Sequence, residues 1–489
     1  MLAIALHLVR LAAITSFSAV IGCGTADSTS SISSSSHQGR LTGEFKLSSH
    51  DLDISTPQIS VGRDGVIHAA FTEAIRPGVE NYVYYRSSGD GGKSWSPAKN
   101  LSEVMPGLMV GHMRLTLDGQ SRPYVIWASA PEANLNLSGN SHANSLYSNL
   151  VYRMLDGGGW SAVQHISTPV DHLHQNSGAG SFFAGTDPGG KVHVAYATNT
   201  DIFHPEYMLN AGGPYAMHQA NMGAGVVAQV DLNGSTHSSP REVFMTQVTT
   251  NGKNRTCDHL DCLDGYFDAS GQAHFIAQTN RAGDPQSPSR IDIVENGRQS
   301  AAVSLPSRQY EQYNLPPYLL HDAQGRNHVI ANVASGEHHS VCDYAVGGNG
   351  EPIVIRQEAS VIYPIRGFQA FQGPQGIMML LMEMDDTGVA DHGDLFFSNN
   401  VGKGWAKPSQ LTTYEKSSTE TYKKTGTRGS VATIGHCDAG PNSAAAYDLQ
   451  GHLVLLQQRD QFGSFGVNGF GVQLAGGGSK SETLLFHRF

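Results

Sequence analysis

The sequence predicts an all-β fold, a single seven-bladed β-propeller, from three observations. First, residues 56–95 hold three runs of alternating apolar and polar side chains, and the turn Arg63-Asp64-Gly65 joins the first two as in an antiparallel meander. Second, a turn followed by a strand recurs seven times, at a spacing of roughly 40 to 80 residues that suits propeller blades with loop insertions. Third, helical periodicity is almost absent.

The seven copies of this unit share a turn rich in Asp and Gly that precedes an apolar run. A third strand follows each copy and a fourth usually follows that, as in residues 83–102 and 150–167. Four strands in each unit make one propeller blade. The copies begin at Val61, Thr116, Gly185, Asp268, His321, Gln372 and Tyr447.

The last copy has only three strands of its own, the third being residues 482–489. An additional strand, residues 41–47, precedes the first copy and has no partner within it. We therefore expect the N-terminal strand to complete the last blade and close the ring.

The loop from Ser88 to Trp95 has the sequence SGDGGKSW and resembles the Asp-box of sialidases and related propellers. The resemblance implies structural roles: Asp90 accepts hydrogen bonds from turn amides, and Trp95 packs between strands. Degenerate copies lie at residues 155–160 and 399–405.

The N-terminus predicts export. Residues 1–23 are apolar from Leu11 to Ile21 and end in Val-Ile-Gly-Cys, which resembles the lipobox of a bacterial lipoprotein signal peptide cleaved before Cys23. Residues 24–39 are rich in Ser and predict a flexible tether before the propeller domain, residues 40–489. The expected location is the cell surface or outer membrane through a lipid anchor, or the secreted fraction.

Composition agrees with an exported all-β protein. Only 15% of the 489 residues are charged, 56 are Gly, and the net charge is −11. No basic stripe occurs, so nucleic acid is not an expected partner, and we expect a monomer.

Propeller topology separates short turns from long loops. Turns between first and second strands lie on one face, while the long loops between second and third strands and between blades lie on the opposite face, where propellers usually bind ligands. Four histidines recur at one repeat position, at the start of the second strand, which favours a structural role: His68, His193, His274 and His328. The long loops are rich in His, Tyr and Arg.

This set of side chains favours β-elimination at a uronic acid. The reaction needs a cation or hydrogen bonds that neutralise the substrate carboxylate, a base that removes the proton at C5, and an acid that protonates the leaving O4. Arg suits the first role, and His or Tyr suit the others. Glycoside hydrolysis usually needs two carboxylates about 5 to 10 Å apart, and the loops show no obvious pair.

At these residues the chain resembles the propeller-fold polysaccharide lyases that cleave ulvan, the rhamnose and uronate polymer of green algae. Those families place His, His, Tyr and Arg in chain order at the cleft, often with zinc. The resemblance implies catalytic roles for His142, His174, Tyr215 and Arg255, with His172 as the alternative to His174 and Tyr207 as the alternative to Tyr215. It implies an anionic polysaccharide as partner, with substrate-binding roles for His172, Tyr207, His218 and Tyr313.

A metal site is a separate expectation. Neighbouring loops of the fourth and fifth blades present thiols and imidazoles that could form a closed, structural zinc site, from Cys257, His259, His338 and Cys342. The alternative is a disulfide between Cys257 and Cys262 with a free, buried Cys342. No other cofactor is expected.

Two other functions stay open. A sialidase-like hydrolase would fit the Asp-box. Such enzymes usually carry an Arg-Ile-Pro-like sequence near the first blade, but this chain has only Ala74-Ile75-Arg76-Pro77 there. The other is a surface propeller that binds glycans without cleaving them.

Overall fold

The computed structural model describes most of the propeller domain, and every described residue belongs to one compact unit, Ser36–Phe489. The described residues are 45–50, 54–76, 80–103, 108–131, 149–167, 181–199, 203, 224–246, 248–251, 254–257, 259–280, 290–304, 316–335, 338–347, 351–358, 365–373, 376–384, 394–412, 430–468, 471–473 and 481–489.

These residues form β-strands and no α-helix, and most of the strands make seven antiparallel sheets, here called blades 1 to 7. From the first strand outward, blade 1 comprises β2 (Ser55–Val61), β3 (Ile67–Arg76), β4 (Glu80–Ser88) and β5 (Lys99–Asn100); blade 2 comprises β6 (Leu108–Leu117), β7 (Pro123–Pro131), β8 (Asn149–Asp156) and β10 (Gln164–His165); and blade 3 comprises β11 (Phe182–Thr186), β12 (Val192–Asn199), β13 (Ala224–Asn233) and β15 (Arg241–Met245). Blade 4 comprises β18 (His259–Phe267), β19 (Ala273–Asn280), β20 (Arg290–Glu295) and β21 (Arg298–Ser304); and blade 5 comprises β22 (Tyr318–His321), β23 (Asn327–Ser335), β24 (His338–Ala345) and β25 (Ile353–Glu358). Blade 6 comprises β26 (Ile365–Gln372), β27 (Met378–Met384), β28 (Asp394–Asn400) and β29 (Ser409–Gln410); and blade 7 comprises β30 (Ser430–Tyr447), β31 (Leu453–Asn468), β33 (Ser481–Arg488) and β1 (Phe45–Lys46).

Short additional strands extend three of the blades: β9 (Gly159–Trp160), β14 (Thr236–His237) and β32 (Gly471–Gln473). A separate hairpin of β16 (Val248–Asn251) and β17 (Asn254–Cys257) stands between blades 3 and 4 in the chain.

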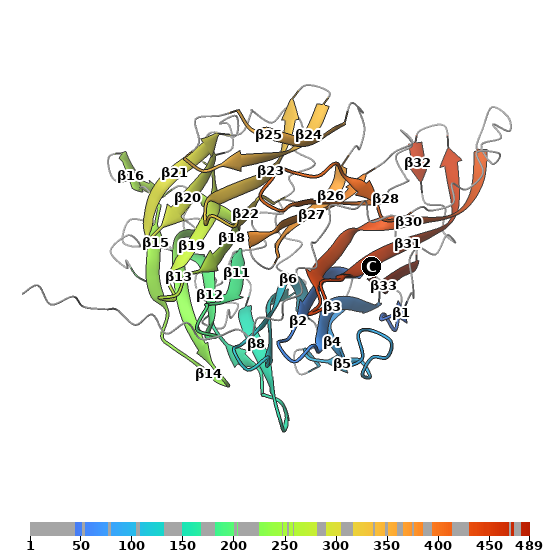
Figure 1. Ribbon diagram of the computed structural model, residues 1–489, viewed down its shortest axis with the longest axis horizontal. Helices are drawn as coiled ribbons and strands as arrows, with labels where there is room; N and C mark the ends of the chain where they lie inside the picture. Colours follow the sequence, from blue (N-terminus) through green and yellow to red (C-terminus); the bar gives the residue numbers. More distant parts are fainter. Residues whose placement is uncertain are drawn as a thin grey trace, which may run out of the picture. The chain divides into compact units, whose positions relative to one another are not determined.

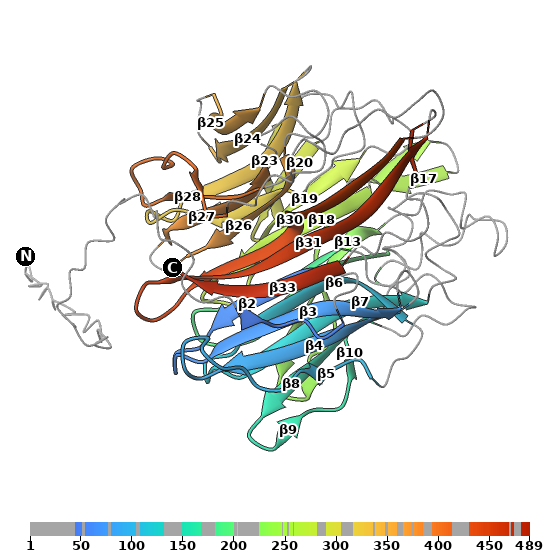
Figure 2. The ribbon, with the colours of Figure 1, turned by 90° about the vertical axis from the view of Figure 1, so that its right-hand side faces the viewer.

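The blades form a closed ring. The first strand of each blade lies beside the first strand of the next, and β30 of blade 7 lies beside β2 of blade 1. Figure 2 shows this junction, with the red strands of blade 7 along the blue strands of blade 1. The all-β, seven-bladed prediction is confirmed.

The N-terminal strand closes the ring as predicted. In β1, Phe45 pairs with Phe486 and Lys46 with Leu485 of β33, so the first strand of the chain is the outer strand of the last blade (Figure 1). The Leu47 amide continues this pairing with a 2.8 Å hydrogen bond to the Leu484 carbonyl. The predicted strand began at residue 41, and residues 41–44 lie outside the described part.

The hydrophobic core lies between blades, in separate clusters at each junction. Between blades 7 and 1, for example, Phe71 packs with Leu456, Leu484 and Leu47, all fully buried. Because each blade is covered on both faces, the alternating side chains of its strands are apolar toward both neighbours.

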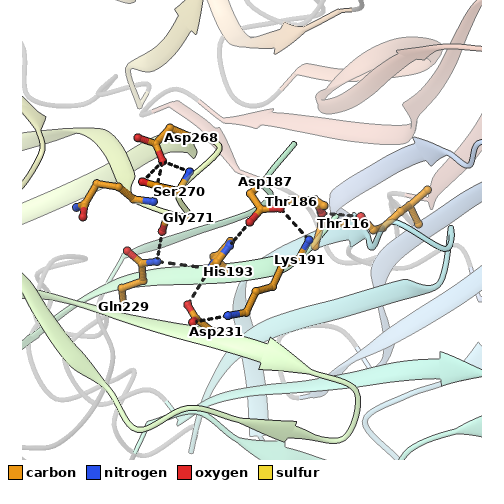
Figure 3. A network of polar contacts seen from close by, with 12 residues as sticks. Thr116, Thr186, Asp187, Lys191, His193, Gln229, Asp231, Asp268, Ser270 and Gly271 are labelled. Carbon is orange, nitrogen blue, oxygen red and sulfur yellow. Dashed lines mark hydrogen bonds and ion pairs between the residues drawn. The ribbon is translucent and has the colours of Figure 1, made fainter. Parts of the chain in front are cut away.

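The recurrent turn aspartates and strand histidines are structural, as the sequence predicts. His193 lies between two carboxylates, 3.0 Å from Asp187 Oδ2 and 2.8 Å from Asp231 Oδ1, as Figure 3 shows. Gln229 continues this network into blade 4 by donating a 2.7 Å hydrogen bond to the Gly271 carbonyl. These contacts connect blades on the face that carries the short turns.

The other three histidines also make side-chain contacts, though not all with the same kind of partner. His68 Nδ1 lies 2.6 Å from the Tyr85 hydroxyl, and burial lowers its pKa to about 4 in spite of the charge of Asp64. The remaining two each contact the aspartate of their own turn: His274 and Asp268, and His328 and Asp322.

The loop from Ser88 to Trp95 has the two structural roles that its sequence implies. Asp90 accepts hydrogen bonds from the hydroxyl and the amide of Ser94, and these hold the pKa of the Asp90 carboxyl below its usual value. Trp95 packs edge-on against Phe486 of blade 7, with ring centroids 5.1 Å apart. Gly92 is required here, since its φ is +89° and a Cβ would lie 1.9 Å from the Phe486 ring.

Candidate functional site

The strand order defines two faces of the ring, here called the turn face and the loop face. First and second strands meet in short turns such as Gly62–Val66, closed by an amide-to-carbonyl hydrogen bond of 2.9 Å. Because the strands are antiparallel, the connections from second to third strand, and from each blade to the next, must all begin and end on the opposite face.

Most of the predicted catalytic and substrate-binding residues lie outside the described residues, but the strands that flank them are described. All the flanking connections belong to the loop face. Those residues are His142 between β7 and β8, His172 and His174 between β10 and β11, Tyr207, Tyr215 and His218 between β12 and β13, and Tyr313 between β21 and β22.

Arg255 is the one predicted catalytic residue whose backbone is described. It lies on β17 and pairs with Thr250 of β16. This hairpin follows the fourth strand of blade 3 and precedes the first strand of blade 4, so it also belongs to the loop face. The four catalytic predictions therefore fall on consecutive connections of blades 2, 3 and 4.

The predicted zinc ligands lie on strands of blades 4 and 5 and on the separate hairpin that precedes blade 4. Cys257 ends β17, His259 begins β18 and His338 begins β24, opposite Ser335. Cys342 lies within β24 as a buried free thiol, and burial together with the charge of Asp343 raises its pKa to about 11. Within the described residues, no group of three or more His, Cys, Asp or Glu side chains is placed to hold a metal ion.

As a set of four, these residues do not fit one zinc ion. His338 and Cys342 are four residues apart on a strand whose pairing with β23 is regular, which separates their Cα atoms by about 13 Å at ~3.3 Å per residue. Zinc ligands lie about 2.0 to 2.3 Å from the metal. Cys342 also pairs with Ala331, which packs in the apolar cluster between blades 4 and 5.

The structure adds a carboxyl group that the sequence reasoning missed. Asp264 lies on β18, the first strand of blade 4, and its Oδ2 accepts a 2.9 Å hydrogen bond from the Leu319 amide on the first strand of blade 5. A bulge between Asp261 and Asp264 displaces the strand register. Gly265 permits this backbone, because a Cβ there would lie 2.2 Å from the His274 carbonyl oxygen.

Asp264 is an unusual carboxyl because its ionised form is disfavoured. Burial raises its pKa to about 6, against the opposing effects of the positive charge of Arg114 and of hydrogen bonds from the amides of Leu319 and Gly265. Carboxyl groups whose pKa is shifted in this way are concentrated at functional sites. The sequence signal, an aspartate followed by glycine inside an apolar strand, was present in Leu263-Asp264-Gly265.

Replacing Asp264 with Asn should raise stability at pH 8. The folded pKa lies above the unfolded value of about 3.9, so the folded state holds the proton more tightly, and stability falls as pH rises from about 4 through about 6. Asn cannot ionise and still offers an oxygen to the Leu319 amide. Chemical denaturation should show a gain of about 3 kcal/mol for the variant at pH 8 and little difference near pH 4. Equal stabilities at pH 8 would contradict this account of Asp264.

Comparison with known proteins gives structural similarities at low sequence identity. No family model matches the chain, and no curated protein matches it. The chain aligns with Hadza microbial sialidase Hz136 at 11% identity and a TM-score of 0.39, over 82% of this chain and 63% of that one, so it spans less than two thirds of that sialidase. It aligns with an α-L-arabinanase of Penicillium chrysogenum at 13% identity and a TM-score of 0.41, over 67% of this chain and 88% of that one.

A third similar structure is an ulvan lyase of polysaccharide lyase family PL25. The identity is 12% and the TM-score 0.39, over 77% of this chain and 81% of the ulvan lyase. The seven-bladed fold of this chain follows from its own strand pairing.

Proposed function

We propose that the chain is a polysaccharide lyase that cleaves a uronic-acid-containing polysaccharide, ulvan first among the candidates, by β-elimination. The observation that carries the proposal is the position of the flanking strands. The connections that contain His142, His174, Tyr215 and Arg255 follow one another around blades 2, 3 and 4, and all of them start and end on the loop face. A substrate on that face can therefore meet imidazole, phenol and guanidinium groups from neighbouring blades.

Each group has one role in the proposed reaction. The Arg255 guanidinium binds the uronate carboxylate and stabilises the charge that develops as C5 loses its proton. His142 or His174 takes that proton, and the C5–H electron pair forms the C4=C5 double bond. The C4–O4 bond breaks, and the phenol of Tyr215 or Tyr207 protonates O4. The products are a new chain end and an unsaturated uronate.

Zinc, which the resemblance implies, has a structural role in this proposal. The proposal keeps Cys257, His259 and His338 as ligands, because the ends of β17, β18 and β24 belong to the loop face of adjacent blades. A zinc ion there would hold the loops of blades 4 and 5 together. No step of the reaction passes through it.

A screen of uronate polysaccharides tests the function. Ulvan, alginate, pectate and glucuronan are incubated with the protein, and the ultraviolet absorbance of the new double bond is recorded. Absorbance that rises with one polymer supports the lyase. New reducing ends without absorbance would indicate a hydrolase, and binding without either product would indicate a non-catalytic glycan-binding propeller.

The proposal places the enzyme on a membrane through a lipid on Cys23. Within the described residues, no helix is long and apolar enough to cross a membrane. Replacing Cys23 with Ala should move the protein from the membrane fraction to the soluble fraction, because one thiol carries the whole anchor. Immunoblotting of fractionated cells measures this, and an unchanged distribution would rule out the lipobox.

A further inference from the structure

His328, the second residue of β23, lies between two buried carboxylates. Its Nδ1 is 2.8 Å from Asp343 Oδ1 on β24, and its Nε2 is 3.5 Å from Asp322 Oδ2 in the preceding turn. The side chains of His328, Asp343 and Asp322 are 8%, 1% and 4% exposed. An ionised carboxylate only accepts hydrogen bonds, so both ring nitrogens must carry protons for both contacts to be favourable. The geometry therefore suits the charged imidazolium.

Asp343 connects this histidine to blade 6. Its second oxygen, Oδ2, accepts a 2.8 Å hydrogen bond from the indole N–H of Trp405. Trp405 follows β28, in the degenerate Asp-box copy at residues 399–405, and packs against the apolar cluster shared by blades 5 and 6. By contrast, the Trp95 indole donates to a carbonyl of its own loop, that of Gly92, at 3.2 Å. The bond from Trp405 is therefore a side-chain link between two blades.

The other recurrent histidines have different partners. His68 contacts a phenol in place of a second carboxylate. His274 contacts one carboxylate, and within the described residues its Nδ1 has no hydrogen-bond partner. His193 also lies between two carboxylates, but the second of these is shared with Lys191 of the same blade. In the described part of the chain, His328 is the one of the four whose second carboxylate also bonds the next blade.

The surroundings of His328 favour its charged form. Burial alone would lower the pKa of His328, but the hydrogen bonds and charges of Asp343 and Asp322 outweigh burial and raise the pKa above its usual value. Burial likewise opposes ionisation of Asp322, yet hydrogen bonds from the amide and the guanidinium of Arg326 lower its pKa to about 2. Asp322 is therefore a carboxylate at any pH at which His328 titrates.

The charged side chains that face His328 come from its own turn and from β24: Asp322, Arg326 and Asp343. Blade 6 contributes the Trp405 indole, which does not titrate. On the side of blade 4, Glu295 contacts the neighbouring Asn327 at 2.6 Å. Cys342 precedes Asp343 in β24 and points to the opposite face of the sheet, because successive side chains of a strand alternate.

We propose that Asp322, His328, Asp343 and Trp405 form a proton-dependent clasp between blades 5 and 6, closed while His328 is charged. The imidazolium holds Asp343 in place to accept the Trp405 indole. When His328 loses its proton, one ring nitrogen presents a lone pair to a carboxylate oxygen, and the repulsion displaces Asp343 and weakens its bond to Trp405.

The sign of the effect follows from the raised pKa of His328. Stability that depends on this proton is fully present below the unfolded pKa of about 6.5, and it is lost as pH rises through the folded pKa. Alkaline pH therefore loosens the ring at the junction of blades 5 and 6. The clasp does not rest on the proposed function.

Nuclear magnetic resonance of the full chain with ¹⁵N-labelled tryptophan tests the clasp, from about pH 5.5 to about pH 9.5. Trp405→Phe assigns the Trp405 indole resonance, which should titrate with a midpoint above about 6.5. Near pH 6 this indole N–H should exchange with solvent about tenfold more slowly in the wild type than in His328→Gln, the size expected for a weakened bond to a charged acceptor. The difference should shrink as pH rises. The buried Trp127 indole, which has no hydrogen-bond partner among the described residues, should not share this midpoint.

Two more variants complete the test. Asp343→Asn keeps an oxygen for the indole but removes the charge, so it should lower the midpoint, and it replaces His328→Gln if that variant does not fold. The matched control is His68→Gln, the same change at the same repeat position of blade 1, where burial lowers the histidine pKa to about 4. It should leave the Trp405 midpoint unchanged. A Trp405 indole that does not respond to pH, a midpoint below about 6.5, or a midpoint unchanged in His328→Gln or in Asp343→Asn would each overturn the clasp.

Discussion

A chain that begins at Ser49 is expected to lose its cooperative fold or to aggregate, whereas a chain that begins at Arg40 stays soluble and folded. The longer deletion removes β1, the fourth strand of blade 7. It also removes Leu47, which is fully buried against Phe71 and Leu484. Loss of one such leucine costs about 2 to 5 kcal/mol, and the uncovered edge of β33 can pair with another chain.

The comparison of the two truncations isolates the closing strand. Ser48 belongs to it as well, because its hydroxyl accepts a 3.2 Å hydrogen bond from the Leu484 amide. Thermal unfolding and size-exclusion chromatography of both proteins measure the effect. Equal melting temperatures, with both proteins monomeric, would show that closure by β1 does not stabilise the ring.

The fold could be predicted from the sequence because local chemistry repeats. In the turn between β6 and β7, Asp118 Oδ1 accepts the amides of Gln120 and Arg122, both at 2.9 Å, which fixes the hairpin without help from the rest of the chain. The same arrangement recurs at Asp322. Period-two alternation of apolar and polar residues then predicts the strands. A four-stranded repeat of this size has few other ways to bury both faces of its sheet.

The candidate site could be predicted only in part. The loop face follows from strand order, so the sequence places His142 and Arg255 on one side of the ring. The sequence does not show which residues of different blades lie at the same height along the ring axis, because that height depends on strand register and on bulges such as the one before Asp264. Asp264 was missed for this reason: its partners, Leu319 and Arg114, are 55 and 150 positions away in the chain.

The four-residue metal site stays a prediction, and the positions of two of its residues show a related limit of sequence spacing. The short sequence distance between His338 and Cys342 suggests proximity, but an extended strand separates such residues more than a loop would. Sequence spacing predicts ligands well only where the backbone between them is known.

Arg255→Ala should lower turnover on the cleaved polysaccharide by about two orders of magnitude or more, with less effect on binding. The uronate carboxylate gains electron density as C5 loses its proton, so a guanidinium placed there stabilises the transition state more than the ground state. The expected size is that of losing one donor to a developing oxyanion. Initial rates of absorbance at several substrate concentrations separate kcat from KM.

Three further variants sharpen this test. Arg255→Lys should restore little activity, because an ammonium group cannot form the bidentate pair with a carboxylate. Arg241→Ala removes an exposed arginine from β15, just before the hairpin that carries Arg255, and should leave the rate unchanged. His142→Ala should show a loss comparable to that of Arg255→Ala.

The pH dependence separates the base from the carboxylate partner. If an imidazole must be neutral to take the C5 proton, the wild-type rate falls on the acidic side, with a midpoint near the usual histidine pKa of about 6.5. Arg255→Ala should keep this acidic limb at a lower rate, because the base is untouched, whereas replacement of the base should remove the limb. Near-normal formation of unsaturated ends by Arg255→Ala would place the neutralising group elsewhere on the loop face. The next candidates are Arg290 at the start of β20 and, outside the described residues, Arg281 and Arg428.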